Sequence, residues 1–504
     1  MNQLFEELEE KYLKKGQAVF AALTLFEWDQ TTEAPEAADE NTAKYVGSLS
    51  DLYFSLYIND EVRGYMEKLN QQTDQIGERE RAILRELGRL YEKLETIPKD
   101  EYSAYSELTA TSVNIWAKAK ENADFSAFMP TLEKIVAYKK RFARYRDPEQ
   151  KKLAYDVLLS DYESGFDHVA LDAFFSLIKK ELPPMIKTIT EKTKDMVDPL
   201  AGKTFDVEKQ KEFSHFLAEY IGFDFTSGVM KESAHPFTTN FHNKDVRITN
   251  HYYEDNLISA IFSIIHEGGH GIYEMQIADE LTQSLVGEGS SMGLHESQSR
   301  FYENVIGRSK EFWEPIYPKL LETFKEQLSD VSLDDFIKVI NRPKCSLIRT
   351  EADELTYSLH VLIRYEVESL LFEDKISVAD IPSVWNKKYQ EYLFVTPEND
   401  KVGALQDVHW ACGDFGYFPS YALGSAVAAQ IYFYMKEHTT LFDHIKDGEL
   451  QPIKAYLGEW IHRFGKTKNT NEILLNMTGE AFEPKYYIQY LKEKYTKIYG
   501  IDFE

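Results

Sequence analysis

Apolar residues recur at helical spacing along most of the chain. Leu4, Leu8 and Tyr12 lie four residues apart among acidic side chains, and residues 150–220 and 310–400 show similar spacing. Residues three or four apart share one face of a helix, so this spacing predicts amphipathic helices with a buried apolar face. Proline is scarce, with 16 in 504 residues. The pattern therefore predicts a mostly α-helical protein.

No break in composition divides the chain. It contains no tract rich in proline, glycine and serine, no low-complexity run and no internal repeat. Length alone favours two or more domains. Because no linker is evident, we expect residues 1–504 to form one large helical domain, with two lobes about a cleft.

A different pattern interrupts the helices at residues 235–253. This stretch is rich in threonine, phenylalanine, valine and isoleucine around a turn-like centre at residues 242–245, which predicts a β-hairpin. In its second strand Asp245, Arg247 and Thr249 share one face, and the apolar residues between them face the other side. Either this polar face lines the cleft, or Arg247 forms only a surface ion pair across the strands.

Directly after the hairpin, residues 257–273 combine helical apolar spacing with the pattern His-Glu-x-x-His. His266 and His270 are four apart, so both imidazoles point to the same side of a helix. Zinc accepts imidazole nitrogen and takes three protein ligands plus a water at catalytic sites. Glu267 lies beside the first histidine, where a carboxylate can take a proton from that water.

The same helix carries two glycines, Gly268 and Gly269, which cost about 1 kcal/mol each relative to alanine within a helix. We expect such a cost only where another backbone or a substrate approaches closely. Asp255 or Asn256 is expected to cap the start of the helix. The five-residue pattern arises by chance in about one protein of this length in fifty, but its buried, helix-periodic context favours a metal site.

A third ligand is expected from a helix that follows the Gly/Ser-rich turn at residues 287–293. Glu296 lies in the first turn of that helix and would complete a His₂Glu site. Alternatively, His295 and Glu296 form an ordinary charged helix start, where acidic residues suit the helix dipole. Glu303 lies seven residues after Glu296, on the same face, and is the weaker candidate.

Residues 346–354 are expected to be helical, which would place Arg349 and Asp353 one turn apart. Taken by themselves, these two side chains are expected to form a solvated intrahelical ion pair worth a few tenths of a kcal/mol.

Residues 403–421 form a segment dense in glycine, aromatic residues and hydrogen-bonding side chains. A glycine-punctuated loop with one histidine and two tyrosines is a reasonable source of donors to a tetrahedral oxyanion. We therefore regard His409, Tyr417 and Tyr421 as candidate catalytic residues. Taken alone, this composition is a weak signal.

The formal net charge is −27, from 84 acidic and 57 basic residues. This disfavours nucleic acid and anionic membranes as partners. Two cysteines are too few for a disulfide framework. The acidic N-terminus does not resemble a signal peptide, and the apolar stretch at residues 421–435 is too short to span a bilayer. We therefore expect a cytoplasmic protein.

Six motifs in order resemble the M32 family of metallocarboxypeptidases, the thermostable carboxypeptidase type, over essentially the whole chain. They are His235-Pro-Phe, Asp245-x-Arg-x-Thr249, His266-Glu-x-x-His270, His295-Glu-Ser-Gln298, Ile348-Arg-x-x-Ala-Asp353 and Gly403-x-x-Gln-Asp-x-His-Trp410. One wider pattern is missing. Many His₂Glu peptidases have an acidic residue four positions after the third ligand, where this chain has Arg300, so the partner of a metal-binding histidine must come from elsewhere.

The resemblance implies a large, mostly helical, two-lobed body with a deep active-site groove and a small sheet near the metal helix, similar to neurolysin and angiotensin-converting enzyme. It implies removal of C-terminal residues from peptides with a free C-terminus, with broad preference but not for C-terminal proline. It also implies one Zn²⁺ per chain, with Co²⁺ as the alternative, and a homodimer.

Carried onto this chain, the resemblance gives His266, His270 and Glu296 as metal ligands and Glu267 as the general base. His409 with Tyr417 or Tyr421 would stabilise the oxyanion. Arg349 is the first choice for the residue that binds the substrate carboxylate, and Arg247 the second. The same motifs imply substrate contacts by five further residues: His235, Asp245, Thr249, Asp353 and Gln406.

Two other classes of protein remain open at this point. One is a zinc peptidase of the same chemistry, namely an endopeptidase, an oligopeptidase or an aminopeptidase. An aminopeptidase needs an acidic group for the substrate amine, where a carboxypeptidase needs a basic one. The other is a helical binding protein without activity, against which the intact Glu267 and three intact ligand positions argue.

Overall fold

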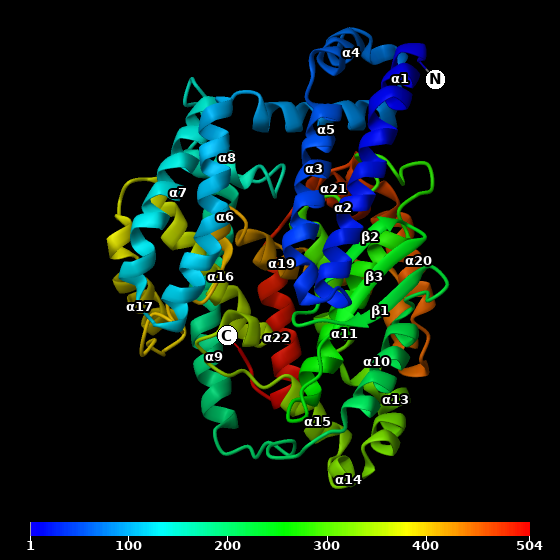
Figure 1. Cartoon of the computed structure of the whole chain (residues 1–504). Helices are drawn as coiled ribbons and strands as arrows, with labels where there is room; N and C mark the ends of the chain where they lie inside the picture. The colour runs from blue at the N-terminus through cyan, green and yellow to red at the C-terminus, as the bar shows by residue number, and fades with distance from the viewer. Residues whose placement is uncertain (1, 504) are drawn as a thin grey trace. The chain divides into compact units, whose positions relative to one another are not determined.

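The structure is a computed structural model that describes residues 2–503, apart from the side chain of residue 36. These residues form a mostly helical protein with a single small three-stranded sheet (Figure 1). The prediction of a mostly α-helical fold with a small β-structure beside the helix that carries His266 and His270 is confirmed. Within the described range, none of the helices combines the length and the apolar composition that crossing a membrane requires.

The chain forms two compact units, each assembled from three stretches of sequence. The first unit comprises the residues up to Glu92, Asp198–Ile337 and Ile431–Ala481. The second comprises Lys93–Val197, Lys338–Gln430 and the residues from Phe482 onward.

Most elements belong wholly to one unit, and α5, α15 and α19 cross a boundary between them. The first unit contains α1 (Gln3–Leu8), the π-helix η1 (Glu9–Leu13), α2 (Lys14–Thr32), η2 (Glu36–Ala38), α3 (Asp39–Tyr57), α4 (Asp60–Asn70), η3 (Thr73–Gln75), α5 (Glu78–Leu94), α10 (Val207–Ile221), β1 (Gly228–Glu232), β2 (Thr238–His242), β3 (Asp245–Asn250), α11 (Leu257–Met275), α12 (Met292–Arg300), the π-helix η4 (Phe301–Ile306), α13 (Lys310–Thr323), α14 (Lys325–Leu328), α15 (Leu333–Ile340), η7 (Leu441–Asp447), α20 (Gln451–Trp460), η8 (His462–Thr467) and α21 (Thr470–Thr478). The second contains α6 (Lys99–Glu121), α7 (Phe125–Arg146), α8 (Ala154–Leu159), α9 (His168–Thr193), η5 (Arg349–Glu351), α16 (Glu354–Phe372), η6 (Val378–Asp380), α17 (Ile381–Tyr392), α18 (His409–Cys412), the first part of α19 (Pro419–His438) and α22 (Lys485–Tyr499).

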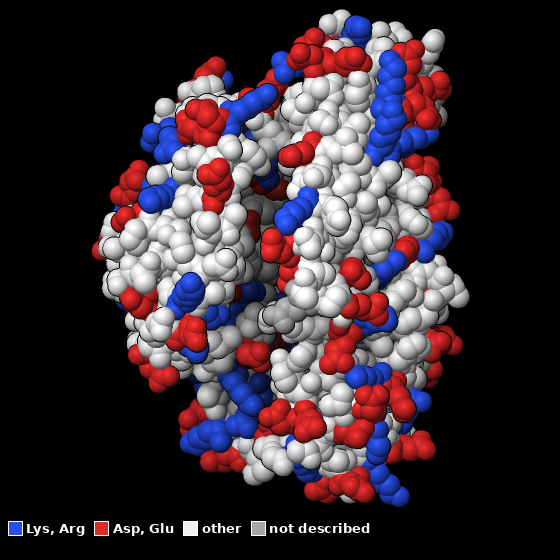
Figure 2. Space-filling view, in the orientation of Figure 1, with Lys and Arg blue, Asp and Glu red and all other residues white. Residues whose placement is uncertain are grey.

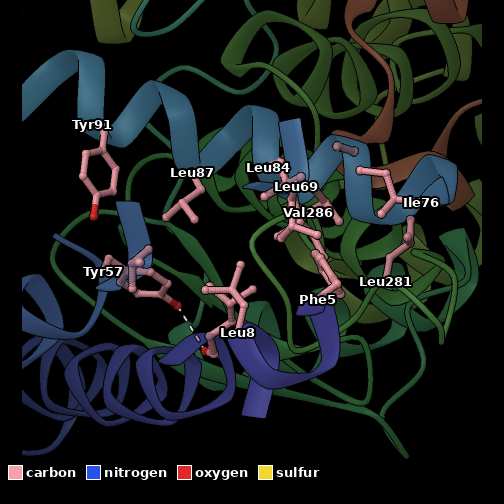
Figure 3. Packing of buried hydrophobic residues seen from close by; sticks show 14 of the residues in the cluster. Phe5, Leu8, Tyr57, Leu69, Ile76, Leu84, Leu87, Tyr91, Leu281 and Val286 are labelled. Atoms are coloured by element: carbon pink, nitrogen blue, oxygen red, sulfur yellow. Dashed lines mark hydrogen bonds between the residues drawn. The ribbon is translucent and has the colours of Figure 1, made fainter. Parts of the chain in front are cut away.

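A hydrophobic cluster ties the N-terminal helices of the first unit to the loop that follows α11 (Figure 3). Phe5 and Leu8 of α1 and Leu84 of α5 are buried in it beside Val286 of that loop. The phenol of Tyr57 enters the same cluster and donates a hydrogen bond to the Leu13 carbonyl at 3.2 Å. Burial of each large apolar side chain stabilises the folded state by about 1.5–3 kcal/mol. The regularly spaced apolar residues near the N-terminus therefore stabilise the fold by packing in this cluster.

The sheet has the order β1-β3-β2, with β3 at its centre. β2 and β3 are antiparallel and form the predicted hairpin, in which Thr239 lies opposite Arg247. β1, which was not predicted, pairs parallel to β3. Val246 and Ile248 are buried on the face that meets α11. A Cβ atom at Gly271 of α11 would lie 3.2 Å from the Ile248 side chain, so the sheet and α11 are in close contact.

The prediction of a helix at residues 346–354 is wrong. Only a short 3₁₀ turn forms at Arg349–Glu351, and α16 begins at Glu354. Asp353 is the N-cap of α16, where its Oδ1 accepts the backbone N–H groups of Leu355 at 3.0 Å and Thr356 at 3.1 Å. Aspartate favours this position because its carboxylate satisfies amides that otherwise lack a partner. An intrahelical Arg349–Asp353 pair is therefore excluded.

On the face of the molecule that Figure 2 presents, acidic side chains are interspersed with lysines and arginines. One exposed ion pair of the first unit joins Lys231 and Glu33 at 2.6 Å. Exposed pairs of this kind contribute little to stability.

Candidate metal centre and active-site residues

His266, His270 and Glu296 converge in the first unit. The Nε2 atoms of the two histidines lie 3.6 Å and 3.5 Å from Glu296 Oε2. One donor atom from each residue falls within 4.8 Å of the others. Ligand atoms bound to one tetrahedral zinc at about 2.0–2.1 Å are roughly 3.3 Å apart, so the donor types and their spacing fit a divalent cation.

The two glycines of α11 allow this convergence. A Cβ atom at Gly269 would lie 2.8 Å from Ser299 Cα and 2.9 Å from the Gln298 carbonyl, both backbone atoms of α12. At Gly268 it would lie 2.5 Å from the Ile221 side chain of α10. The expected close approach of another backbone is therefore confirmed, and it brings the helix carrying Glu296 against the helix carrying the histidines. Asn256 caps α11, accepting from Ser259 N–H at 3.2 Å.

His266 is supported by Glu303, whose Oε2 lies 2.9 Å from its Nδ1. Glu303 also accepts from Arg300 at 3.1 Å and Arg308 at 2.9 Å. Burial opposes ionisation of Glu303, but the two guanidinium groups hold its pKa well below the usual range. Arg300 additionally donates to Glu296 Oε1 at 2.7 Å. Glu303, the weaker ligand candidate, thus occupies the position of a ligand's partner.

His270 is supported through another histidine. Its Nδ1 lies 2.5 Å from His295 Nδ1, and His295 Nε2 lies 2.7 Å from Glu274 Oε1. Glu274 also accepts from Asn240 at 2.8 Å and from the Gly289 amide at 2.9 Å. Burial lowers the pKa of His270 to about 3, so its imidazole is neutral. With Nε2 facing the metal position, Nδ1–H donates to His295, whose own Nε2–H then donates to Glu274.

Glu267 is buried, and its Oε2 accepts a hydrogen bond from the Thr238 hydroxyl at 2.6 Å. Burial raises the pKa of this carboxyl group. Thr238 lies on β2, so the sheet sets the orientation of the carboxylate beside the metal ligands. Sequence reasoning missed Thr238. The sequence signal that could have identified Thr238 was a threonine in the strand before the helix that carries His266 and His270.

The other predicted residues of the sheet contact one another or the backbone. Arg247 donates to both oxygens of Asp245, at 2.9 Å and 3.0 Å, and its guanidinium lies 4.4 Å from the centre of the Phe241 ring. Thr249 was predicted to share a polar face with them, but it is fully buried and its hydroxyl accepts the Phe237 amide at 2.9 Å. The side chain of His235 is exposed.

Arg349 belongs to the second unit, where it is buried. Its Nε and Nη2 atoms donate to Asp407 Oδ1 at 3.1 Å and 3.0 Å, and Nη1 donates to the Tyr357 hydroxyl at 3.0 Å. The guanidinium lies 4.7 Å from the centre of the Tyr421 ring. Gln406 accepts the Arg349 amide at 3.1 Å. Arg349 is thus fixed on several sides and does not contact Asp353.

A second arginine, Arg364, shares the same carboxylate. It donates to Asp407 Oδ2 and to Gln406 Oε1, the latter at 2.7 Å. Burial opposes ionisation of Asp407, but the two arginines hold its pKa well below the usual range. Two guanidinium groups around one carboxylate leave an excess positive charge in this buried group. Arg364 was missed by sequence reasoning, although a charged residue within an apolar helical stretch was a signal.

His409, Tyr417 and Tyr421 are brought together in the second unit. His409 Nε2 lies 3.3 Å from the Tyr421 hydroxyl, and its ring stacks on that of Tyr417 with centres 5.4 Å apart. Burial, followed by the nearby Arg349, lowers the pKa of His409 to about 4. Burial raises the pKa of Tyr421 well above its ordinary value. At neutral pH His409 and Tyr421 are therefore uncharged and retain protons that they can donate.

This helical fold and a His₂Glu donor set with an adjacent glutamate define a metallopeptidase. The sequence matches the family model described as Carboxypeptidase Taq (M32) metallopeptidase over residues 9–495. The chain therefore belongs to the M32 family.

Several proteins named as carboxypeptidases resemble this chain in sequence and in structure. The chain is 42% identical to Carboxypeptidase 1 of Bacillus subtilis over 488 residues, which are 97% of each protein. It is 35% identical to Thermostable carboxypeptidase 1 of Pyrococcus furiosus, covering 98% of this chain and 99% of the relative. The crystal structure of M32 carboxypeptidase from Deinococcus radiodurans R1 superposes with a TM-score of 0.94 at 29% identity, covering 99% of this chain and 100% of the other. The structure of Trypanosoma cruzi metallocarboxypeptidase 1 gives a TM-score of 0.93 at 34% identity, covering 98% and 99%.

Proposed function

We propose that this protein is a metallocarboxypeptidase that removes C-terminal residues from peptides with a free C-terminus. The observation that carries the proposal is the convergence of His266, His270 and Glu296 beside the buried carboxylate of Glu267. These ligands would hold one Zn²⁺ per chain, with Co²⁺ as the alternative. When bound, such an ion lowers the pKa of a water molecule and polarises the scissile carbonyl.

Glu267 is the proposed general base. It takes a proton from the attacking water and later passes one to the leaving amine. Its burial raises the pKa of the carboxyl group, and a higher pKa makes the carboxylate a better proton acceptor. The hydrogen bond from Thr238 fixes the plane of the carboxylate, so the base is oriented before substrate binds.

The excess positive charge around Asp407 supports a role in binding the substrate carboxylate. Arg349 and Arg364 together carry two positive charges against the one negative charge of Asp407. A C-terminal carboxylate would neutralise the excess, and a charge-assisted hydrogen bond to it is worth about 1.5–3 kcal/mol. We keep Arg349 as the proposed carboxylate-binding residue and Arg247, whose fork is paired with Asp245, as the second choice.

His409 and either Tyr417 or Tyr421 are the proposed donors to the oxyanion. The neutral state of His409 and Tyr421 at pH 7 supports this role, because the imidazole N–H and phenol O–H groups are the donors that a developing negative charge requires. His235, Asp245 and Thr249 of the first unit, and Asp353 and Gln406 of the second, remain proposed contributors to substrate binding. Asp353 also accepts a backbone N–H at the N-terminus of α16, and Gln406 also accepts a hydrogen bond from Arg364.

The broader properties of the enzyme are proposed from family membership alone. They are a broad preference for the C-terminal residue with exclusion of proline, assembly as a homodimer, and a cytoplasmic location. Size-exclusion chromatography with light scattering measures the assembly, and a set of peptides that differ only in their last residue measures the preference.

One digestion experiment tests the central proposal. An unblocked peptide, its C-terminal amide and its N-acetyl form are each incubated with the metal-loaded enzyme, and products are identified by mass spectrometry. We expect stepwise loss of C-terminal residues from the free-acid peptides, no cleavage of the amide, and loss of activity with a chelator. Cleavage of the amide at the same rate would contradict an exopeptidase that needs a free C-terminus, and release of N-terminal residues would indicate an aminopeptidase.

A further inference from the structure

α16 carries a stripe of charged and polar residues that no motif of the sequence includes. His360, Arg364 and Glu368 are four residues apart, so they share one face of the helix, and each is fully buried. Burying a charged side chain costs free energy unless hydrogen bonds compensate for the lost water. The partners of this stripe are therefore informative.

Two residues of the stripe hold a single segment of chain. We call residues 406–416 the His409 segment, because His409 lies near its middle. Arg364 binds its beginning, donating to Gln406 and Asp407, each at 2.7 Å. These two residues directly precede Val408 and His409 in the chain.

Glu368 binds the remainder of the His409 segment. Its Oε1 accepts the indole N–H of Trp410 at 2.8 Å, and its Oε2 accepts the Gly416 amide at 3.1 Å. The hydroxyl of Tyr155 on α8 also donates to Oε2, at 3.0 Å. Trp410 directly follows His409, and Gly416 directly precedes Tyr417. Glu368 thus contacts the neighbours in sequence of two proposed oxyanion donors.

The His409 segment needs such external contacts. Its only helix within this range, α18, has 4 residues, which is too short to be stable by itself. Gly413 and Gly416 adopt φ angles of +81° and +85°. A Cβ atom at Gly416 would lie 2.8 Å from the Leu159 amide nitrogen, so the loop is pressed against α8. The orientation of the His409 side chain therefore depends on the groups that bind this segment.

We propose that Glu368 is a positioning residue, which holds His409 and Tyr417 in the catalytically competent arrangement only while its carboxylate is ionised. The inference rests on the proposed function in one respect, namely that these two residues act on the substrate. The inference goes beyond the proposed function because Glu368 acts through Trp410 and Gly416, and touches neither the substrate nor a proposed metal ligand.

The electrostatic surroundings make the ionisation of Glu368 easy to change. Burial raises the pKa of Glu368 to about 7. The ionisable groups that face it are Arg364 on its own helix, Tyr155 on α8 and Tyr162 after α8. The tyrosines are neutral near pH 7, and Arg364 donates its hydrogen bonds elsewhere.

The chemistry of a carboxyl group gives the direction of the effect. Ionised Glu368 offers acceptors to all three of its donors. Protonated Glu368 has an O–H group of its own. This O–H competes with one of the N–H or O–H groups that donate hydrogen bonds to the carboxylate. The His409 segment therefore loosens as the pH falls through about 7, and catalysis should fall with it.

The kinetic test uses the full-length, metal-loaded enzyme and an unblocked peptide, with kcat and KM measured from pH 5.5 to 8.5. Glu368→Gln should lower kcat at pH 8 roughly ten- to a hundredfold, the range expected when a catalytic group is misplaced by about 1 Å, and should remove the acid limb near pH 7. Tyr155→Phe removes one hydrogen-bond donor to the carboxylate, so it should shift the acid limb of the kcat–pH profile to higher pH. At pH 8.5 the kcat of this variant should be close to that of the wild type. Glu354→Gln is the matched control on the same helix, because Glu354 is buried against Tyr490 and Lys494 instead, and its pH profile should match the wild type.

The second readout is independent of metal and of peptidase activity. The indole ¹⁵N–¹H resonance of Trp410, assigned by its absence in Trp410→Phe, is followed by NMR in the metal-free protein over the same pH range. We expect it to titrate in the wild type, to titrate at higher pH in Tyr155→Phe, and to stay constant in Glu368→Gln.

Two results would overturn the inference. One is an indole resonance that ignores pH or titrates identically in Glu368→Gln. The other is a normal indole titration with an unchanged kcat–pH profile in Glu368→Gln, which would show that the contact does not position the catalytic groups. A wild type that titrates normally but cleaves no peptide would instead overturn the proposed function, and leave the contact between Glu368 and the His409 segment established.

Discussion

His295 Nδ1 lies 2.5 Å from His270 Nδ1, so one histidine supports another at the candidate metal centre. Metal-binding histidines usually donate their second N–H to a carboxylate, a carbonyl or water. Here the carboxylate, Glu274, is one residue further away, on the other side of His295. Arg300 occupies the position where many His₂Glu peptidases have an acidic residue; in this chain Glu303 is the carboxylate partner of His266, and His270 is connected to Glu274 through His295.

The hydrogen-bonded relay from His270 through His295 to Glu274 predicts a loss of metal affinity when one of its members is replaced. Glu274→Gln and His295→Ala should each weaken metal binding about 10–100-fold, the usual effect of removing a partner of a metal ligand. Competition with a calibrated chelator measures the affinity directly. His215→Ala is the control, because His215 is an exposed histidine stacked on Phe225. Unchanged metal affinity in both relay variants would show that His270 needs no such support.

Replacement of glycine by alanine should have opposite effects on stability at one position in α11 and one position in α3. Gly269→Ala forces a methyl group against the backbone of Ser299. Overpacking of this kind costs about 1–3 kcal/mol, and displacement of α12 should also weaken metal binding through Glu296. Gly47→Ala in α3 meets no atom within 4 Å, so the higher helix propensity of alanine should stabilise the protein by about 0.5–1 kcal/mol.

Urea denaturation and chelator competition on both glycine variants test this difference. If Gly269→Ala keeps wild-type stability and metal affinity, the contact between α11 and α12 does not set the position of Glu296.

Removal of the proposed base should separate metal binding from catalysis. Glu267→Gln keeps the three ligands, so it should retain about one metal ion per chain while kcat falls by at least about 100-fold, the contribution typical of general base catalysis. His270→Ala should lose both metal and activity. Elemental analysis and kcat on one unblocked peptide provide the two measurements. A Glu267→Gln enzyme with near-normal kcat would assign the base to another residue.

Short-range patterns predicted the parts of the fold that depend on neighbouring residues. The apolar spacing before His266, the cap at Asn256 and the hairpin at residues 238–250 are all properties of a few consecutive residues. The glycine pair also signalled a close contact, although the identity of the second helix came only from the structure.

The errors concern partners distant in sequence. β1 forms because it pairs with β3, and no turn signal marks that contact. The helix predicted around Arg349 competes with a better arrangement, in which Asp353 caps α16 and Arg349 reaches Asp407, 58 residues away. Helix propensity over a few residues is a weak preference that such long-range contacts override.

Substitutions of Arg349 should affect free-acid peptides most. Arg349→Ala removes the excess positive charge but leaves Asp407 paired with Arg364, so the protein should fold while kcat/KM for a free-acid peptide falls roughly 10–100-fold, about 1.5–3 kcal/mol. Arg349→Lys should recover only part of this, because an ammonium group lacks the planar fork. The value of kcat/KM for the same free-acid peptide in the wild type, Arg349→Ala and Arg349→Lys measures both the loss and the partial recovery. Unchanged kcat/KM in Arg349→Ala would move the proposed carboxylate contact to Arg247.

The raised pKa of Glu368 has a consequence for stability as well as for catalysis. In the unfolded chain the carboxyl group has its ordinary pKa of 4.5, and in the folded protein burial raises it to about 7. Between these values the folded state holds a proton that the unfolded state has released. The free energy of unfolding therefore decreases as the pH rises through this window, by up to about 1.4 kcal/mol per pH unit from this group.

Glu368→Gln removes this contribution because an amide does not titrate. The stability of the wild type minus that of Glu368→Gln should therefore be largest at pH 5, the lowest pH of the series, decrease by about 2 kcal/mol between pH 5 and pH 7, and level off near pH 8. Urea denaturation of the metal-free proteins at pH 5, 6, 7 and 8 measures this difference, in which contributions from all other groups cancel. A difference that is constant across the series would mean that Glu368 titrates at its ordinary pKa. In that case the carboxylate would be ionised throughout the range in which the enzyme works, and the acid limb expected in kcat would have to come from another group.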